Sequence, residues 1–269
     1  MRIIRYQTPN NETHHGIQTS PNHATRLQAD PIHHGVQPTD TIDTVERLLA
    51  PLTPPNIFCI GQNYRRHAEE TGAPIPTQPV IFMKPTTAIQ NPAEPVAIPA
   101  CNTHGDEVDY EVELAVIIGK PTRNATEDNA LDHVFGYTVA NDISARRWQK
   151  HAGGGQWIRG KSFDTFCPLG PAILTADEIP DPQALHLTTT LNNQTLQDSN
   201  TADMIFPVKT LIAFLSQDTT LLPGTLILTG TPEGVGFTRK PPIFLQPGDT
   251  VTATVEPIGG LTNPITTAI

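Results

Sequence analysis

Two glutamates separated by one residue stand inside a run that is otherwise rich in valine, isoleucine and tyrosine. The run covers residues 108–120 and reads VDYEVELAVIIGK. Such residues favour a β-strand, and side chains two positions apart on a strand point to the same face. Asp109, Glu111 and Glu113 would therefore share one face. Carboxylates crowded together repel one another and resist burial, so a positive charge is expected beside them.

All-oxygen ligands suit a hard divalent cation such as Mg²⁺ or Mn²⁺ better than they suit zinc. The alternative is a solvated strand face, which is the more common situation for a Glu-x-Glu pair taken alone. The pair therefore gives a metal-site hypothesis that other segments of the chain have to support.

His67 and Glu70 form a second candidate for chemistry. They lie in a segment with the signs of a short helix, with Asn63 as cap and Gly72 as stop. Residues three apart meet on one side of a helix, and a carboxylate beside an imidazole orients it as a general base. An ordinary surface pair is the alternative. Prolines at 74, 76 and 79 predict an extended loop next, so this turn could act as a mobile lid.

Asp142 lies where a predicted strand at 134–142 gives way to a helix that starts near Ala145, with Ser144 as its cap. The backbone holds side chains rigidly at such junctions, although Asp142 could also be only a helix-starting acid. Further on, residues 230–236 read GTPEGVG. These glycines would let backbone amides and the Thr231 hydroxyl approach an anion, but the loop lacks the Lys-Ser/Thr ending of a P-loop.

Composition narrows the class of protein. The chain has 269 residues, of which 37% are hydrophobic, and no apolar run of membrane-spanning length. Its formal net charge of −10 argues against a nucleic-acid partner, which would require a basic stripe. We expect no membrane partner either. Three cysteines without metal-site spacing, and no targeting segment at the N-terminus, favour a cytoplasmic location.

The chain contains 27 prolines and 19 glycines, which end helices and form turns, so its sequence predicts many short strands. Residues 1–52 are expected to form a small N-terminal module with a helix over 41–49, and residues 53–269 the main domain. The glycine run at 153–155 predicts a flexible connection. Further elements expected in the main domain are strands at 56–60, 80–84, 187–191, 225–229 and 250–255, a turn at 192–193, and a helix over 207–215.

Taken in this order, five motifs resemble the fumarylacetoacetate hydrolase family. They are GQNY at 61–64 with His67 and Glu70, DYEVELA at 109–115, NDISAR at 141–146, GKSFD at 160–164 and LTGTPEGVG at 228–236. The resemblance covers about residues 48–265. FDTFCPLGP at 163–171 and RKPP at 239–242 are most similar to the domain-containing protein 2 branch of the family.

The resemblance implies an α+β fold with a β-rich mixed sheet, like that of the fumarylacetoacetate hydrolase C-terminal domain, and a homodimer. It also implies a site with three parts. The metal ligands for Mg²⁺ or Mn²⁺ would be Glu111, Glu113 and Asp142; the catalytic groups would be His67, Glu70 and Lys161; and the substrate would be bound by Arg146, Gln149, Lys161 and Thr231.

Substrates of the family are small 2-oxo or β-dicarbonyl carboxylates. The resemblance implies C–C bond hydrolysis or decarboxylation through a metal-stabilised enolate. One alternative is keto–enol tautomerisation of an oxaloacetate-like acid, and another is a non-catalytic binding relative. The sequence departs from the family pattern at Arg147, where Asp is usual. This change reverses a charge near Asp142 and Gln149 but leaves the expected metal ligands in place.

Overall fold

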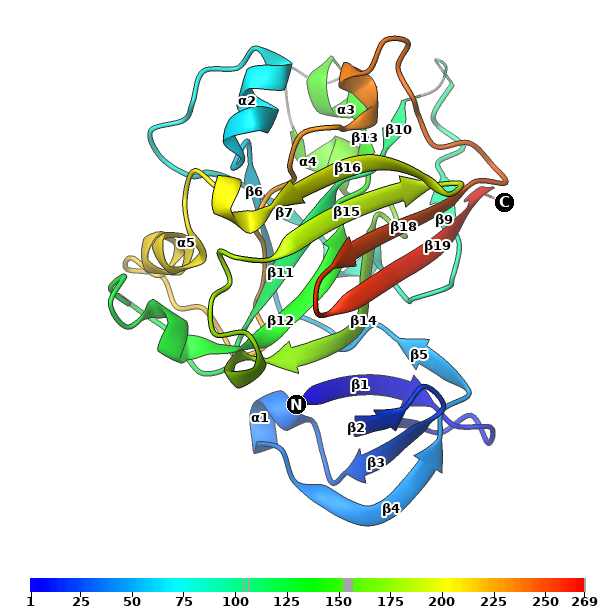
Figure 1. Ribbon diagram of the computed structural model, residues 1–269, viewed down its shortest axis with the longest axis vertical. Helices are drawn as coiled ribbons and strands as arrows, with labels where there is room; N and C mark the ends of the chain where they lie inside the picture. Colours follow the sequence, from blue (N-terminus) through cyan, green and yellow to red (C-terminus); the bar gives the residue numbers. More distant parts are fainter. Residues whose placement is uncertain (104, 106, 152–156, 269) are drawn as a thin grey trace.

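A twelve-stranded mixed sheet and a five-stranded sheet form the body of the molecule, and short helices cover one end (Figure 1). This computed structural model describes residues 1–103, 105, 107–151 and 157–268. The glycine run at 153–155 lies outside the described residues. The β-rich α+β class expected from the sequence is confirmed.

Strand β11 (Val112–Ile118) lies inside the larger sheet, between β12 and β17, and every residue of β11 is buried. Alternate side chains of this strand enter two different cores: Val112, Leu114 and Val116 face one, whereas Ala115 and Ile117 face the other. Glu113 falls in the second set by its position in the alternation. The strands that the main domain contributes to this sheet lie in the spatial order β14 (Cys167–Thr175), β12 (Val134–Asn141), β11 (Val112–Ile118), β17 (Leu226–Leu228), β6 (Ile57–Gly61) and β7 (Val80–Lys84), of which β7 is at the edge. A further short strand, β8 (Ile89–Gln90), pairs with β14.

The smaller sheet packs against one face of the larger sheet, where it covers β11 and β12. Leu187, Ala253 and Leu261 from this sheet share a buried cluster with Leu114 and Val139. Its strands in spatial order are β16 (Gln194–Asn200), β15 (His186–Leu191), β18 (Thr250–Val255), β19 (Gly259–Thr267) and β9 (Val96–Ile98). A separate two-stranded sheet consists of β10 (Val108–Asp109) and β13 (Ser144–Ala145).

The N-terminal module continues the larger sheet, because β1 pairs with β14 through Arg2↔Leu174 and Ile3↔Ile173. Figure 1 shows the module in blue at the end of the molecule opposite α2 and α3. Its elements are β1 (Arg2–Gln7), β2 (Thr13–Ser20), β3 (His23–Leu27), α1 (Pro31–His34), β4 (Pro38–Thr44) and β5 (Arg47–Leu49).

The helix predicted over 41–49 is wrong, since strands β4 and β5 occupy that segment. Asp43 and Val45 are buried, whereas Ile42 is 66% exposed, so burial here follows the two-residue period of a strand. The Asp43 carboxylate accepts hydrogen bonds from Arg26 and Tyr6. Strand pairing and this buried ion pair therefore decide the local structure, against a weak helical pattern.

The α-helices of the main domain are short. They are α2 (Arg65–Thr71), α3 (Arg146–Lys150), α4 (Trp157–Lys161) and α5 (Val208–Leu215), and the single 3-10 turns are η1 (Thr86–Ala88), η2 (Ala130–His133), η3 (Ala176–Glu178), η4 (Thr201–Asp203) and η5 (Gly236–Thr238). Within the residues that the structure describes, no helix is long and apolar enough to cross a membrane.

Two predicted helix caps are wrong. Asn63 does not cap α2; its side chain instead binds backbone groups of Phe206 and Thr229. Ser144 does not cap α3, because it belongs to β13 and its hydroxyl donates to the carbonyl of Asp142. The stop at Gly72 is confirmed by its left-handed φ of 66°.

The remaining predicted elements of the main domain form within one or two residues of their expected limits. These are the strands β6, β7, β12, β15, β17 and β18, the left-handed turn at Asn192 and Asn193, and the helix α5. Their alternating apolar residues and Pro-Gly or Asn-Asn turns are local signals, which explains why the sequence locates them.

Candidate active site

The acidic segment at 108–118 is two strands with a break between them, not one continuous strand. β10 ends at Asp109 and β11 starts at Val112, because Val108 and Asp109 pair with β13 and leave the main sheet. The prediction that Asp109 shares a face with the two glutamates is therefore wrong. Its buried carboxylate binds Arg146 and the backbone amides of Gly236 and Phe237.

Glu111, Glu113 and Asp142 come together as a buried cluster. Each offers a carboxylate oxygen, and these oxygens all lie within 4.8 Å of one another. Strand register explains the meeting: Val112 pairs with Asn141, and the amide of Asp142 donates to the carbonyl of Glu111 at 2.9 Å. The antiparallel pair β11–β12 thus joins acids that are some thirty residues apart in sequence.

Two cationic side chains bind the Glu111 carboxylate. Lys161 Nζ lies 2.6 Å from Glu111 Oε2 and 2.6 Å from Asp142 Oδ2, while Arg146 Nη1 lies 2.6 Å from Glu111 Oε1. Burial raises the pKa of Glu111, but the nearby Lys161 and Arg146 outweigh burial and lower this pKa to about 2. Glu111 is thus ionised and held by cations on both oxygens.

Lys84 is a further buried cation that the sequence did not assign to the site. Its Nζ lies 2.7 Å from Asp142 Oδ1, and the same ammonium donates to the carbonyls of Ile143, Lys161 and Phe166. The three N–H groups of Lys84 are thus used by carbonyls, so it acts on Asp142 chiefly as a fixed charge. Its only sequence signal was a lysine at the end of the predicted strand 80–84.

Glu113 has no cationic partner among the described residues. Its Oε2 accepts a hydrogen bond from the Gly230 amide at 2.7 Å. Burial, together with the charges of Asp142 and Glu111, raises the pKa of Glu113 well above its usual value. If all groups are ionised, the four carboxylates Asp109, Glu111, Glu113 and Asp142 exceed the three cations by one charge. A divalent cation with oxygen ligands fits this surplus.

His67 and Glu70 face one another across one turn of α2, as their spacing predicts. His67 Nδ1 lies 3.4 Å from Glu70 Oε2, and His67 is buried and lines the same cavity as Glu111 and Glu113. The Glu70 carboxylate also accepts from the Gly234 amide and from the Thr238 hydroxyl at 2.8 Å. α2 is therefore fastened to the loop that precedes and includes η5.

The glycine-rich loop at 230–236 binds carboxylates of the protein itself. Amides of Gly230, Gly234 and Gly236 donate to Glu113, Glu70 and Asp109. Thr231 lines the cavity, and its hydroxyl accepts from Gln197, a residue that the sequence did not single out. The backbone amides of these glycines were expected to approach an anion closely, and they do so with carboxylates of the site, which they hold in place. Gly236 shows why it is needed, since a Cβ there would lie 1.9 Å from the Ile243 carbonyl oxygen.

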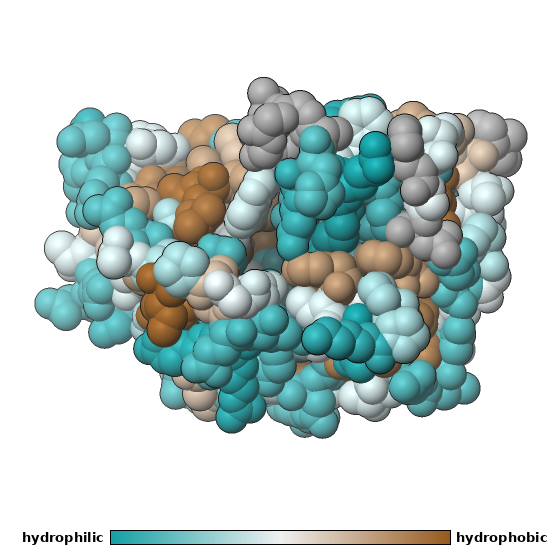
Figure 2. Space-filling view, turned by 90° about the horizontal axis from the view of Figure 1, so that it is seen from above, coloured by the Kyte–Doolittle hydropathy of each residue, from teal (hydrophilic) through white to brown (hydrophobic). Residues whose placement is uncertain are grey.

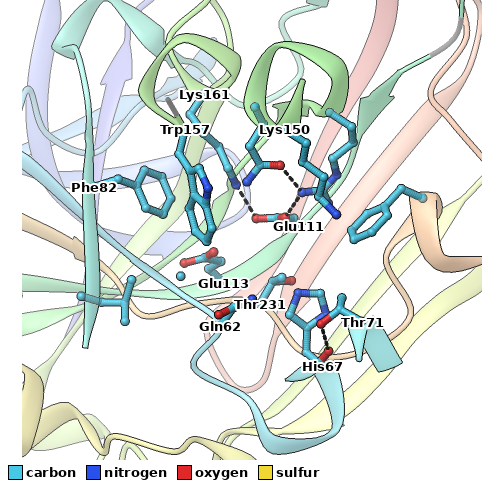
Figure 3. Close-up of a pocket in the computed structure, with 15 residues that line it drawn as sticks. Gln62, His67, Thr71, Phe82, Glu111, Glu113, Lys150, Trp157, Lys161 and Thr231 are labelled. Carbon is cyan, nitrogen blue, oxygen red and sulfur yellow. Dashed lines mark hydrogen bonds and ion pairs between the residues drawn. The ribbon is translucent and has the colours of Figure 1, made fainter. Parts of the chain in front are cut away.

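The remaining predicted site residues also line the cavity, which has a volume of about 70 Å³. Gln149 accepts from Arg146 at 3.1 Å. Figure 3 shows Phe82 and Trp157 on one side of Glu111, and His67 with Thr71 below it on the other. The aromatic wall formed by Phe82 and Trp157 was not predicted from the sequence. The glycine at position 61 was the one weak hint of it in the sequence. The structure shows why a glycine is needed there, since a Cβ on Gly61 would lie 2.3 Å from the Trp157 ring.

The end of the molecule that carries α2 and α3 is seen from above in Figure 2. Its surface there is largely hydrophilic, with hydrophobic residues visible in a hollow between the hydrophilic parts. An acidic cluster, an imidazole and aromatic side chains thus meet in a small cavity at this end. Such a cavity can bind a small carboxylate through a cation and move a proton on it.

Comparison with known proteins agrees with this geometry. A family model described as fumarylacetoacetate (FAA) hydrolase C-terminal matches residues 56–266. The chain belongs to the fumarylacetoacetate hydrolase family. The resemblance noted in the sequence is therefore confirmed. A second model, described as Rv2993c-like, N-terminal, matches residues 1–51.

Individual members of the fumarylacetoacetate hydrolase family are similar over most of the chain. The mitochondrial oxaloacetate tautomerase of Xenopus laevis is 49% identical over 219 residues, which cover 81% of this chain and 68% of that protein. A mitochondrial oxaloacetate tautomerase of Homo sapiens is 46% identical over 218 residues, with the same coverage of 81% and 68%.

Solved structures of the family extend the match to the whole chain. Fumarylacetoacetate hydrolase from Exiguobacterium antarcticum has a TM-score of 0.88 at 35% identity, and 5-carboxymethyl-2-hydroxymuconate delta-isomerase from Mycobacterium smegmatis has 0.85 at 38%. Each alignment covers 100% of both chains.

The expectation of a cytoplasmic location is contradicted by these relatives. The similar oxaloacetate tautomerases of Xenopus laevis and Homo sapiens are mitochondrial proteins. Three free cysteines fit any reducing compartment, so they do not single out the cytoplasm.

Proposed function

We propose that this protein is an oxaloacetate tautomerase, which interconverts the keto and enol forms of oxaloacetate or of a closely similar 2-oxo diacid. The observation that carries this proposal is the buried cluster of Glu111, Glu113 and Asp142, whose two glutamates line one small cavity with His67. Tautomerisation needs a way to stabilise an enolate and a group that moves a proton, and the cavity offers both. The names of the two similar tautomerases support this choice of substrate.

The three carboxylates would hold Mg²⁺ or Mn²⁺. The fit rests on Glu113, whose buried carboxylate has a backbone amide as its only partner in the described part of the chain, while Glu111 and Asp142 lie beside it. When bound, the cation would draw electron density from the carbonyl of the substrate and so stabilise an enolate. Lys161 would contribute a second positive charge at the same place, since its ammonium lies between Glu111 and Asp142.

His67 would carry the proton. Its imidazole lines the cavity and its Nδ1 faces Glu70, an arrangement that leaves Nε2 for the substrate. Taking a proton from C3 of the keto form gives the enolate, and delivery of a proton to the 2-oxo oxygen gives the enol. Glu70 would orient His67 and stabilise its protonated form. Thr231, Gln149 and Arg146 would position the substrate, because they line the same cavity.

Hydrolysis or decarboxylation of a C–C bond, the main expectation from the sequence, has weaker support. It requires the same enolate, and hydrolysis also requires a water molecule placed for attack. The relatives from Xenopus laevis and Homo sapiens, at 49% and 46% identity, are named tautomerases. The isomerase from Mycobacterium smegmatis likewise carries the name of a proton-shifting enzyme.

A homodimer remains a proposal as well. β7 is an edge strand of the larger sheet and exposes Ile81 at 41% and Met83 at 37%. Exposed apolar side chains on a strand edge favour pairing with another chain. Light scattering would give the mass in solution, and a monomer of about 29.2 kDa would contradict the proposal.

Stopped-flow spectroscopy of the enol absorbance of oxaloacetate, with and without Mg²⁺, tests the proposed reaction. We expect Mg²⁺-dependent acceleration over buffer, and its loss in Glu113→Ala. No acceleration over buffer with Mg²⁺ or Mn²⁺ would remove the tautomerase. Cleavage of acylpyruvates without tautomerisation would restore the hydrolase.

A further inference from the structure

Among the residues that the structure describes, three lysine and arginine side chains line the cavity, and two of them are already paired with carboxylates of the protein. Arg146 binds Asp109 and Glu111, and Lys161 binds Glu111 and Asp142. Lys150, the last residue of α3, makes no hydrogen bond or ion pair with the part of the chain that the structure describes. Its Nζ lies 3.5 Å from the centre of the Phe237 ring.

Lys150 stands at the junction of two cavities. It lines the inner cavity of about 70 Å³ and also a wider one of about 460 Å³. Arg146 and Phe237 are the other two residues that the cavities share. In Figure 3, Lys150 lies on the opposite side of Glu111 from Phe82 and Trp157. A ligand that extends outward from the acidic cluster along this side therefore meets Lys150.

The wider cavity is also cationic at this point. Arg147, His151 and Phe244 line it with Lys150. The acidic residue among its described lining residues is Glu107, whose Oε2 accepts from the Arg147 amide. Arg147 therefore adds a second positive charge next to Lys150 in the lining of this cavity.

The size of the inner cavity indicates how a substrate would lie. Its volume of about 70 Å³ corresponds to roughly five water molecules. A four-carbon diacid bound at the acidic cluster through its 2-oxo carboxylate end would fill this space, so that its other carboxylate lies at the boundary. A carboxylate there would replace the contact of Lys150 with Phe237 by a stronger charge-assisted hydrogen bond.

We propose that Lys150 binds the second carboxylate of a dicarboxylic substrate and thereby selects diacids over 2-oxo acids with an uncharged far end. The inference rests on the proposed function, which places the 2-oxo end at the acidic cluster. Lys150 is a specificity residue in this proposal and takes no part in the proton transfer.

The test compares oxaloacetate with its 4-methyl ester, which lacks the far charge. KM and kcat for both are measured with Mg²⁺ in wild type, Lys150→Met and Lys150→Arg. Lys209→Met is the matched control, because Lys209 lies on α5, pairs with Glu127 and lines neither cavity. We expect Lys150→Met to raise KM for oxaloacetate about tenfold or more, since a charge-assisted hydrogen bond is lost.

The same variant should change kcat, and both constants for the ester, by less than about twofold. Lys150→Arg should keep most of the preference for the diacid, and Lys209→Met should match wild type. An equal change for both compounds in Lys150→Met, or no change for either, would overturn the assignment of Lys150.

Failure of the proposed function would be visible separately, as absence of catalysis by the wild type. In that case, calorimetric titration of the two compounds into wild type and Lys150→Met with Mg²⁺ decides the inference. Weaker binding of the diacid alone supports the role of Lys150. Equal binding of the diacid by both proteins rejects it.

Discussion

Arg146 donates from Nε to the Asp109 carboxylate at 2.8 Å, and the same guanidinium reaches Glu111 at 2.6 Å. The ion pair is buried, with exposed fractions of 8% for the Arg146 side chain and 0% for that of Asp109. Asp109 therefore holds in place the cation that neutralises one oxygen of Glu111. Although Asp109 is not a member of the acidic cluster, it supports the geometry of that cluster.

Asp109→Ala should destabilise the protein strongly, because it removes one of the two carboxylates paired with the buried Arg146 charge and leaves three backbone amides without their partner. Breaking a buried pair in this way typically costs about 3–5 kcal/mol. Urea unfolding of the metal-free protein measures the free energy of unfolding. Asp177→Ala is the control at an exposed acid, with an expected change of less than about 0.5 kcal/mol. A loss below about 1 kcal/mol in Asp109→Ala would show that the ion pair has little structural weight.

His67→Ala should reduce the rate of tautomerisation by about 10²- to 10⁴-fold, because removal of a general base typically has an effect of this size. The stopped-flow enol assay measures the rate, and melting temperature reports whether α2 stays folded. His33→Ala is a matched control, since His33 lies on α1 in the N-terminal module. A rate within about threefold of wild type would exclude His67 as the base.

Glu113 should make the metal-free protein less stable as the pH rises. Burial, Asp142 and Glu111 raise its pKa in the folded state, so the folded protein binds this proton more tightly than the unfolded chain does. The resulting stability is fully present below the unfolded pKa near 4.5 and is lost as the pH rises through the folded pKa. Glu113→Gln removes the loss.

Thermal unfolding from pH 4 to pH 9 in EDTA checks this expectation for Glu113. Wild type should melt below Glu113→Gln at the upper end of the range, with roughly 2–4 °C for each kcal/mol of difference. Added Mg²⁺ should raise the melting temperature of wild type more than that of the variant. Parallel pH profiles of the two proteins would contradict the raised pKa.

Glu111 should show the opposite pH dependence. Burial raises its pKa, but Lys161 and Arg146 outweigh this and lower the value to about 2, so its contribution to stability is present above about 4.5 and is lost as the pH falls toward 2. Glu111→Gln should therefore be less stable than wild type at pH 7, and the difference should shrink in acid. Acid titrations followed by circular dichroism measure this, and a constant difference from pH 7 to pH 2 would reject the assignment.

Gly61→Ala should displace Trp157 from the wall of the cavity, because the new Cβ would lie 2.3 Å from the Trp157 ring. Overpacking of this kind typically costs about 1–3 kcal/mol. Tryptophan fluorescence reports the displacement, since the chain has only one other tryptophan, Trp148. In the double variant Gly61→Ala with Trp157→Ala, the added cost of Gly61→Ala should disappear. Equal costs of Gly61→Ala in both backgrounds would show that the two residues do not compete for space.

Local patterns in the sequence were sufficient for a large part of the site. The spacing of His67 and Glu70 places them on one side of α2, and the spacing of Glu111 and Glu113 predicts that they share a direction. Both predictions depend only on the period of one helix or strand. The same holds for the strands and turns of the main domain, whose apolar alternation and glycine, proline or asparagine turns are local.

Tertiary structure alone decided which partners these side chains have. Asp109 leaves the acidic face because β10 pairs with β13, and residues 41–49 form strands because β3 and β1 pair with them. Lys84 reaches Asp142 from another strand, and Lys150 lies at the junction of two cavities. The period of an element fixes where a side chain points, whereas its neighbours depend on strand register and long-range packing, which no local pattern contains.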